Sequence, residues 1–286
     1  MSDVIANIDP GTVWKHFSDL NAVPRPSKKE ERVMAFMMDF GTSLGLETLK
    51  DPVGNIVIRK PATPGMENRK KVVLQAHLDM VHQKNNATVF DFESQGIEMF
   101  LDGDWVRAKG TTLGADNGLG VAAIMGILAS DDIPHPALEA LFTIDEETGM
   151  TGAKELANDL LTGSILLNLD TEEDDTLCVG CAGGVDVTAR GTYIHVAIDG
   201  GARGLSIRIN GLQGGHSGMD IHKGLGNANL LLGRLLLVCA EAAPVSLSAM
   251  DGGSLRNAIP REARALVVVP PGDWDSVLHA LEDEKK

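Results

Sequence analysis

A chain of 286 residues, of which 43% are hydrophobic and 23% charged, is long enough for one large domain or two smaller ones, each with a core. Its 40 acidic residues outnumber its 25 basic ones, and the formal charge of −15 argues against binding to nucleic-acid phosphates. No apolar run approaches the roughly 18 residues of a membrane span, and the N-terminal stretch lacks the basic-then-apolar order of a secretory signal. Three cysteines fit a reducing compartment, so we expect a soluble, cytoplasmic protein.

Helix-like and strand-like patterns alternate through the first 180 residues. The expected elements are a helix at 27–45, strands at 55–59 and 72–78, a hairpin at 97–108, a helix at 118–130, a strand at 137–144, a helix at 151–160 and a strand at 164–169. Ser27 is the expected N-cap of the first helix, with Glu30 at the capping-box position. This alternation predicts an α/β domain with a largely parallel sheet covered by helices.

The pattern changes near residue 184. Residues 185–198 and 205–213 alternate apolar and polar side chains, which is typical of half-exposed antiparallel strands. A helix at 224–241, strands at 245–249 and 263–269, and a helix from about 273 follow. We therefore expect an inserted α+β sandwich as a lid domain, with domains at 1–185 and 186–286 and a hinge at Gly183-Gly184.

The strand at 72–78 ends in His77-Leu78-Asp79. Residues two apart on a strand face the same way, and ligands of α/β sheets bind at the carboxyl ends of strands. His77 is therefore placed like a metal ligand that Asp79 orients. The alternative is an ordinary turn at the end of a strand.

Acidic residues also follow two other apolar strands and precede one helix. Asp145, Glu146 and Glu147 follow the strand at 137–144. Adjacent carboxylates repel each other unless a cation or a shared proton relieves them, so one of these residues could bind a metal while another serves as a general base. The alternative is a solvated acidic loop.

Asp170 follows the strand at 164–169 in the same way, and Asp116 directly precedes the helix at 118–130. An Asp can bridge two cations through its two oxygens. The alternative for Asp116, or for its neighbour Asn117, is an N-cap.

Taken together, these groups predict a catalytic metal site. One imidazole among carboxylates suits Zn²⁺, Co²⁺ or Mn²⁺, and several carboxylates around one His suggest a two-metal centre. His216 lies between glycines on an expected loop, GLQGGHSGMDIHKG. Such a His is an ordinary loop residue by default, but it is also well placed to reach a substrate oxyanion.

Five motifs carry a resemblance to a known family: QAHLDMV, GADNGLG, FTIDEETGMTGA, LLNLDTEE and GGHSGMDIHKG. In this order they resemble the dinuclear zinc aminopeptidase/carboxypeptidase/aminoacylase family, and most of all its bacterial cytosolic dipeptidases. The resemblance extends over the whole chain. It implies hydrolysis of dipeptides, including Xaa-His, and a homodimer formed through the lid domain.

The resemblance also implies the metal ligands. His77 and Asp170 would bind the first zinc ion, Glu147 the second, and Asp116 would bridge the two. Co²⁺ or Mn²⁺ could substitute for zinc.

Three further roles come from the same resemblance. Asp79 would hold the His77 imidazole, and Glu146 would be the general base that takes a proton from the attacking water. His216 would stabilise the oxyanion, often from the partner subunit.

One departure from the family pattern affects the expected activity. Family members continue past the lid and return to the catalytic domain, where a last His binds the second zinc ion. For the chain as given we expect weak binding of the second metal and little peptidase activity. The alternatives are an inactive remnant that binds metal or dimerises, or a related aminoacylase or tripeptidase.

Overall fold

The computed structural model of the protein describes residues 5–6, 8–171, 175, 183, 185 and 187–284. The chain divides into two compact units, Met1–Cys181 (unit 1) and Ala182–Lys286 (unit 2). The expected hinge at Gly183-Gly184 falls partly on a residue outside the described ones, and the expected boundary at 185–186 stays a prediction. Each unit has its own sheet and its own hydrophobic core.

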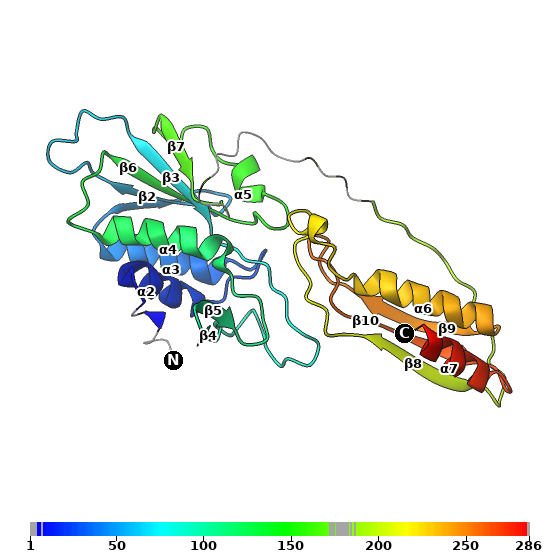
Figure 1. Cartoon of the computed structure of the whole chain (residues 1–286). Coiled ribbons are helices and arrows are strands. Elements are labelled where there is room, and N and C mark those ends of the chain that lie inside the picture. Colours follow the sequence, from blue (N-terminus) through cyan, green and yellow to red (C-terminus); the bar gives the residue numbers. More distant parts are fainter. Residues whose placement is uncertain are drawn as a thin grey trace. The chain divides into compact units, whose positions relative to one another are not determined.

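Unit 1 is built on a five-stranded sheet (Figure 1). Its elements are α2 (Gly11–Asn21), α3 (Glu31–Ser43), β1 (Glu47–Lys50), β2 (Ile56–Lys60), β3 (Val72–His77), β4 (Met99–Asp102), β5 (Trp105–Ala108), α4 (Ala115–Ala129), β6 (Leu138–Thr143), α5 (Thr151–Lys154) and β7 (Ile165–Asn168). The strand order is β1-β2-β6-β3-β7. β3 runs parallel to β6 and β7, whereas the β1–β2 and β2–β6 pairs are antiparallel.

The expected α/β class is confirmed, with a sheet that is mixed at one side. β1 and β2 pair in antiparallel fashion because Asp51 closes a tight turn between them. Its Oδ1 accepts hydrogen bonds from the backbone N–H groups of Val53, Gly54 and Asn55. β4 and β5 form a separate hairpin at the predicted place, with Gly103 and Asp104 as its turn.

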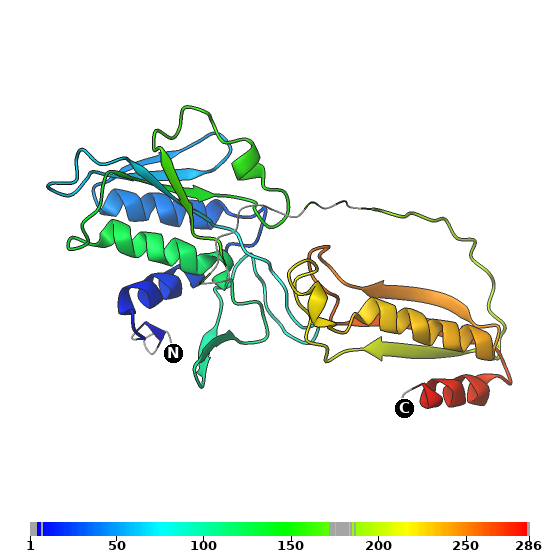
Figure 2. The ribbon, with the colours of Figure 1, turned by 45° about the horizontal axis from the view of Figure 1, so that its top comes forward.

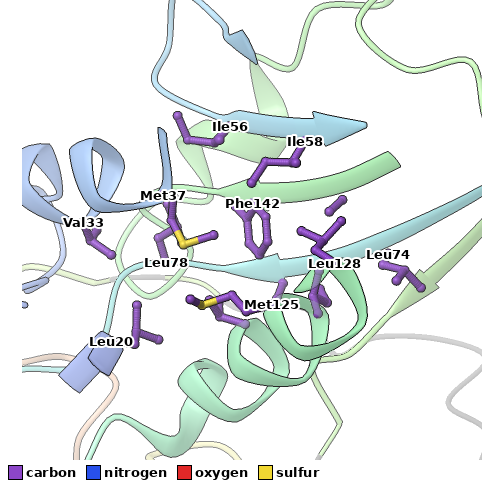
Figure 3. Packing of buried hydrophobic residues seen from close by; sticks show 14 of the residues in the cluster. Leu20, Val33, Met37, Ile56, Ile58, Leu74, Leu78, Met125, Leu128 and Phe142 are labelled. Atoms are coloured by element: carbon purple, nitrogen blue, oxygen red, sulfur yellow. The ribbon is translucent and has the colours of Figure 1, made fainter. Parts of the chain in front are cut away.

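The core of unit 1 lies between the sheet and its helices (Figure 3). Alternate side chains of β2 and β3, such as Ile56, Ile58 and Leu74, face α3 and α4, and α2 packs against α4 (Figure 2). The opposite face is covered by a smaller cluster, in which Val57 and Val73 contact leucines of the segment after α5. β7 is an edge strand whose residues are all exposed.

Two helix predictions need correction. The first helix begins at Glu31 rather than near Ser27, because the Ser27 hydroxyl binds Asp79 and does not cap the helix. The helix expected at 151–160 ends at Lys154. Beyond it, Leu156 and Leu160 pack on the sheet from non-helical backbone, and the Asn-Asp pair between them favours a turn over a helix.

Unit 2 is a two-layer α/β sandwich. Its elements are β8 (Arg203–Ile209), the short 3-10 helix η1 (Ile221–Lys223), α6 (Ala228–Ala242), β9 (Ser246–Gly252), β10 (Ala263–Val269) and α7 (Trp274–Asp283). The antiparallel sheet has the order β8-β10-β9. Leu232 of α6 and Val277 of α7 pack with Val267 of β10 in one core.

The strand predicted at 185–198 is not formed in the described part of that segment. Residues 185 and 187–198 have no strand assignment, and their apolar side chains, such as Tyr193 and Ile194, are exposed. Alternation of apolar and polar residues gives a strand only where a neighbouring strand supplies hydrogen-bonding partners, and no described segment does so here. Within the described residues, no helix has both the length and the apolarity needed to span a membrane.

Candidate metal centre

Four segments of unit 1 bring polar side chains to one edge of the sheet. Because β3 and β6 are parallel and His77 pairs with Thr143, the residues that follow β6 lie beside the end of β3. β7 is parallel to β3 on its other side, which brings Asp170 to the same edge. α4 begins there as well and contributes Asp116.

His77 is the centre of this arrangement. Its Nε2 lies 3.0 Å from Asp116 Oδ1 and 3.7 Å from Asp170 Oδ2. One ligand atom from each of these three residues lies within 4.8 Å of the other two. A second group with the same spacing joins His77 to Glu146 and Glu147. All the metal ligands expected from the sequence therefore come together.

Asp79 is fully buried behind the imidazole. Its Oδ1 lies 3.3 Å from His77 Nδ1, and the Asp79 backbone oxygen is 3.1 Å from the same nitrogen. Two acceptors at Nδ1 favour a proton there and leave the Nε2 lone pair for a cation. Asp79 also accepts hydrogen bonds from the backbone N–H groups of Glu146 (3.0 Å) and Glu147 (3.2 Å), so it ties the β6 loop to β3.

Neither Asp116 nor Asn117 caps α4, so the N-cap alternative is wrong. The N-cap position of α4 is Gly114, without a side-chain cap, and Asp116 has a non-helical backbone (φ −81°, ψ 115°). Asn117 instead joins the strand ends: it accepts from the His77 backbone N–H and donates to Leu169 O and to Asp170 Oδ1.

Asp145 differs from its two acidic neighbours. It is buried, and its carboxylate accepts hydrogen bonds from the hydroxyls of Thr148 and Thr151 and from Lys28 Nζ. Burial alone would raise the pKa of Asp145, but these donors outweigh it and hold the pKa below its usual range. Asp145 is thus a structural carboxylate of the loop, and Glu146 and Glu147 are the members of the run that face His77.

The electrostatics of the cluster favour a cation. Burial opposes a charge on His77, but hydrogen bonds to Asp116 and Asp79 outweigh it and raise the pKa of His77 to about 10. Burial and the charge of Asp116 raise the pKa of Glu147 to about 8 and that of Asp170 to about 7. Carboxylates are thus crowded beyond what one imidazolium can balance. A divalent ion would relieve them, and the donor set of one imidazole with several carboxylates fits such an ion.

His216 belongs to unit 2. Its Nδ1 accepts hydrogen bonds from the backbone N–H groups of Gly218 (3.1 Å) and Met219 (3.0 Å). The backbone N–H of His216 donates to Asp220 Oδ2. With Nδ1 an acceptor, the ring proton lies on Nε2. The side chain therefore offers a hydrogen-bond donor at Nε2.

Sequence reasoning missed three residues that support the centre: Arg25, Ser27 and Asn117. Ser27 Oγ donates to Asp79 Oδ2 over 2.7 Å, and Arg25 is buried beneath the site. Burial lowers the pKa of Arg25 to about 10, so the guanidinium stays charged at neutral pH. The available signal was an Arg between two prolines, followed by Ser, shortly before a helix.

A cavity of about 380 Å³ adjoins the segment that contains Ser27. It is lined by Pro26, Ser27, Lys28, His82, Phe90 and Phe92, among others. His82 is half-buried and packs edge-on against Phe92.

Comparison with known proteins identifies related families and relatives for both units of the chain. Residues 55–179 match Peptidase family M28, and residues 207–284 match the peptidase dimerisation domain. The chain is 48% identical over 277 residues to the cytosol non-specific dipeptidase of Escherichia coli (strain K12), covering 97% of this chain and 57% of the relative.

Solved structures give the same result. The aminoacylhistidine dipeptidase from Vibrio alginolyticus is 46% identical, with a TM-score of 0.62, over 99% of this chain and 58% of that one. A tripeptidase from Staphylococcus aureus, at 18% identity and a TM-score of 0.50, shares the fold over 96% of this chain and 71% of its own. The chain thus spans somewhat more than half the length of the dipeptidases it matches. The family resemblance that the five motifs indicate is thereby confirmed, and the two relatives at 46–48% identity are dipeptidases.

Proposed function

We propose that this chain is the catalytic and lid portion of a metal-dependent dipeptidase. The observation that carries the proposal is the position of the Asp116 and Asp170 carboxylates around His77 Nε2, at the edge of a sheet related to those of dipeptidases. Residues 1–185 would form the catalytic domain, and 186–286 the lid and dimerisation domain. The substrates would be dipeptides, Xaa-His among them, because the relatives are named for this activity.

The proposed ligands are His77, Asp116, Glu147 and Asp170. They would hold Zn²⁺, or Co²⁺ or Mn²⁺ in its place, with two ions in a complete site. A bound dication polarises the peptide carbonyl and lowers the pKa of water.

The residues of the chain have separate tasks in this reaction. Asp79 fixes the imidazole of His77 so that Nε2 faces the carboxylates. Glu146 accepts the proton of the attacking water and passes it to the leaving amine. His216, through its Nε2–H, donates a hydrogen bond to the developing oxyanion. A cytoplasmic homodimer, with His216 reaching the partner's centre, would complete the arrangement; the dimerisation-domain match and the cytosolic relative support it.

The test is hydrolysis of β-alanyl-histidine and other dipeptides by the purified chain with added Zn²⁺ or Co²⁺, at the low turnover that we expect for the chain as given. Glu146→Gln should reduce turnover by roughly 100-fold or more, since it removes the base, and should leave metal affinity nearly unchanged. Glu155→Gln, an exposed acid after α5, is the matched control and should behave like wild type.

The outcomes separate the candidate functions. Hydrolysis that persists in a chelator, or that survives Glu146→Gln, would contradict the proposal. Metal binding with no detectable hydrolysis at all would instead support a non-catalytic module that binds metal or dimerises.

A further inference from the structure

The loop Arg25–Glu30, here called the template loop, lies directly behind the candidate metal centre. Pro26 pairs with Met80 as a parallel bridge, and the Met80 backbone N–H donates to Arg25 O. The template loop thus runs alongside the segment that follows His77.

Arg25 joins two of the segments that carry ligands. Its Nη1 donates to Leu78 O (3.1 Å) and Asp79 O (3.2 Å), directly after His77. Its Nη2 donates to Gly114 O (2.5 Å), two residues before Asp116. A guanidinium can bind both segments at once because its donors are fixed in one planar fork.

Two glycines make room for this fork. A Cβ at Gly114 would lie 2.5 Å from Arg25 Nη2, and one at Gly118 would lie 2.6 Å from it. Gly114 also has φ +73°, a left-handed conformation that favours glycine. The approach of the guanidinium to the start of α4 therefore depends on small residues on both sides of Asp116.

The rest of the template loop reaches the third segment. Ser27 Oγ donates to Asp79 Oδ2. Glu30 Oε1 accepts the backbone N–H of Asp145 (3.1 Å), and Lys28 Nζ lies 3.1 Å from Asp145 Oδ2. The template loop thereby contacts the segments after β3, before α4 and after β6.

We propose that the template loop sets the spacing of the metal ligands, and that Arg25 is the positioning residue that fixes the segment of His77 against the segment of Asp116. This inference rests on the proposed function, because it assumes that these side chains bind a metal. Ligand-to-metal distances of about 2.0–2.2 Å leave little tolerance, so a loosened spacing weakens binding.

The test is titration of the purified 286-residue chain with Co²⁺, followed through the visible absorption of the bound ion. Arg25→Lys keeps the charge but loses the planar fork. It should lower Co²⁺ affinity by roughly 10- to 100-fold and change the absorption spectrum, which reports coordination geometry. Ser27→Ala should also lower the Co²⁺ affinity, with a smaller loss of thermal stability than Arg25→Lys.

Arg59→Lys is the matched control. Arg59 also binds a fork of partners, Glu139, Glu47 and Leu160 O, but at the opposite end of the sheet from His77. This variant should lose stability and keep its Co²⁺ affinity and spectrum. If Arg25→Lys does not fold, Ser27→Ala decides the question.

Normal Co²⁺ affinity and spectrum in both template-loop variants would overturn the inference and leave the proposed function standing. Equal losses of Co²⁺ affinity in Arg59→Lys and in the template-loop variants would also overturn it, because such losses would reflect general destabilisation. A wild-type chain that binds no Co²⁺ would overturn the proposed function itself.

Discussion

His77 is held on both of its ring nitrogens, and this arrangement decides what it can bind. Asp79 occupies the Nδ1 side, while Nε2 faces the carboxylates of Asp116 and Asp170. The buried Asp79 carboxylate has four partners: the Ser27 hydroxyl, His77 Nδ1 and two backbone N–H groups of the loop after β6. One carboxylate therefore controls both the tautomer of His77 and the position of the neighbouring acids.

Asp79→Asn tests this control. An amide presents a donor where the two backbone N–H groups and the Ser27 hydroxyl need acceptors, so the imidazole and the loop lose their alignment. We expect Co²⁺ affinity to fall by roughly 10- to 100-fold, measured by titration. Asp132→Asn, in an exposed loop, is the control. Affinity within twofold of wild type for Asp79→Asn would refute the positioning role.

His216 should affect turnover and not metal binding. His216→Ala removes the Nε2–H donor, and we expect hydrolysis of dipeptides to fall by roughly 100- to 1,000-fold with Co²⁺ affinity unchanged. His222→Ala, an exposed His on the same segment, provides the comparison and should keep full turnover. Loss of Co²⁺ affinity in His216→Ala would show that this His acts as a ligand instead.

The strands of unit 1 have different tasks at their two ends. At the end of β3 and β6 that carries His77, the polar groups are gathered for binding. At the other end, the Glu139 side chain is fully buried and accepts hydrogen bonds from the Thr162 and Gly163 backbone N–H groups and from Arg59 Nε. The groups that stabilise the fold and the groups of the proposed metal site thus lie at opposite ends of the same strands.

Glu139→Gln should show this division through pH. Burial would raise the pKa of Glu139, but its donors outweigh it and hold the pKa below the usual range. The charged form is therefore favoured in the folded state, so its contribution is present above the usual Glu pKa of about 4.3 and is lost as the pH falls through the lowered value.

We expect Glu139→Gln to lower the free energy of unfolding by about 1–3 kcal/mol near pH 7, measured by urea denaturation in a chelator. The difference from wild type should narrow below pH of about 4. Glu47→Gln, which removes an exposed partner of Arg59, should cost less than about 1 kcal/mol. If Glu139→Gln lowers the free energy of unfolding equally near pH 7 and below pH of about 4, the charge of Glu139 is not the cause of its contribution.

Local sequence patterns predicted most elements of both units, and contacts between distant segments account for the differences. The hairpin at 97–108 and the helix at 118–130 follow from turn chemistry and apolar composition alone. Ser27 has the sequence context of an N-cap, yet Asp79, far along the chain, accepts its hydroxyl. The proposed metal ligands were predictable because each lies near the end of an expected strand or the start of an expected helix. Arg25 was not, because its partners on the segments of these ligands are backbone carbonyls, which every residue has.

At the scale of the whole molecule, two separate cores predict two unfolding transitions. The unit 1 core lies between the five-stranded sheet and α3 and α4, and the unit 2 core lies between β8–β10 and α6 and α7. Metal binds residues of unit 1 in the proposed site, so Zn²⁺ or Co²⁺ should stabilise that unit. The expected gain is about 2.7 kcal/mol when the free metal concentration is 100 times Kd.

Differential scanning calorimetry with and without metal checks this expectation. One transition should move to higher temperature on adding metal, and the other should stay in place. Asp116→Asn, which removes a proposed ligand from unit 1, should abolish the shift without moving the second transition. Equal shifts of both transitions would contradict independent stabilisation of the two units.

The template loop has a further consequence, for the order in which the protein folds during synthesis. Arg25 contacts Leu78 across 53 positions and Gly114 across 89, and Glu30 contacts Asp145 across 115. β6 also lies between β2 and β3 in the sheet, although it follows both in the chain. Contacts so far apart in sequence form late, because the loops between them must close first. On the ribosome, the proposed ligands therefore cannot reach their final spacing until the chain has been translated beyond Asp170, so the sheet must be assembled before a metal ion can bind at this site.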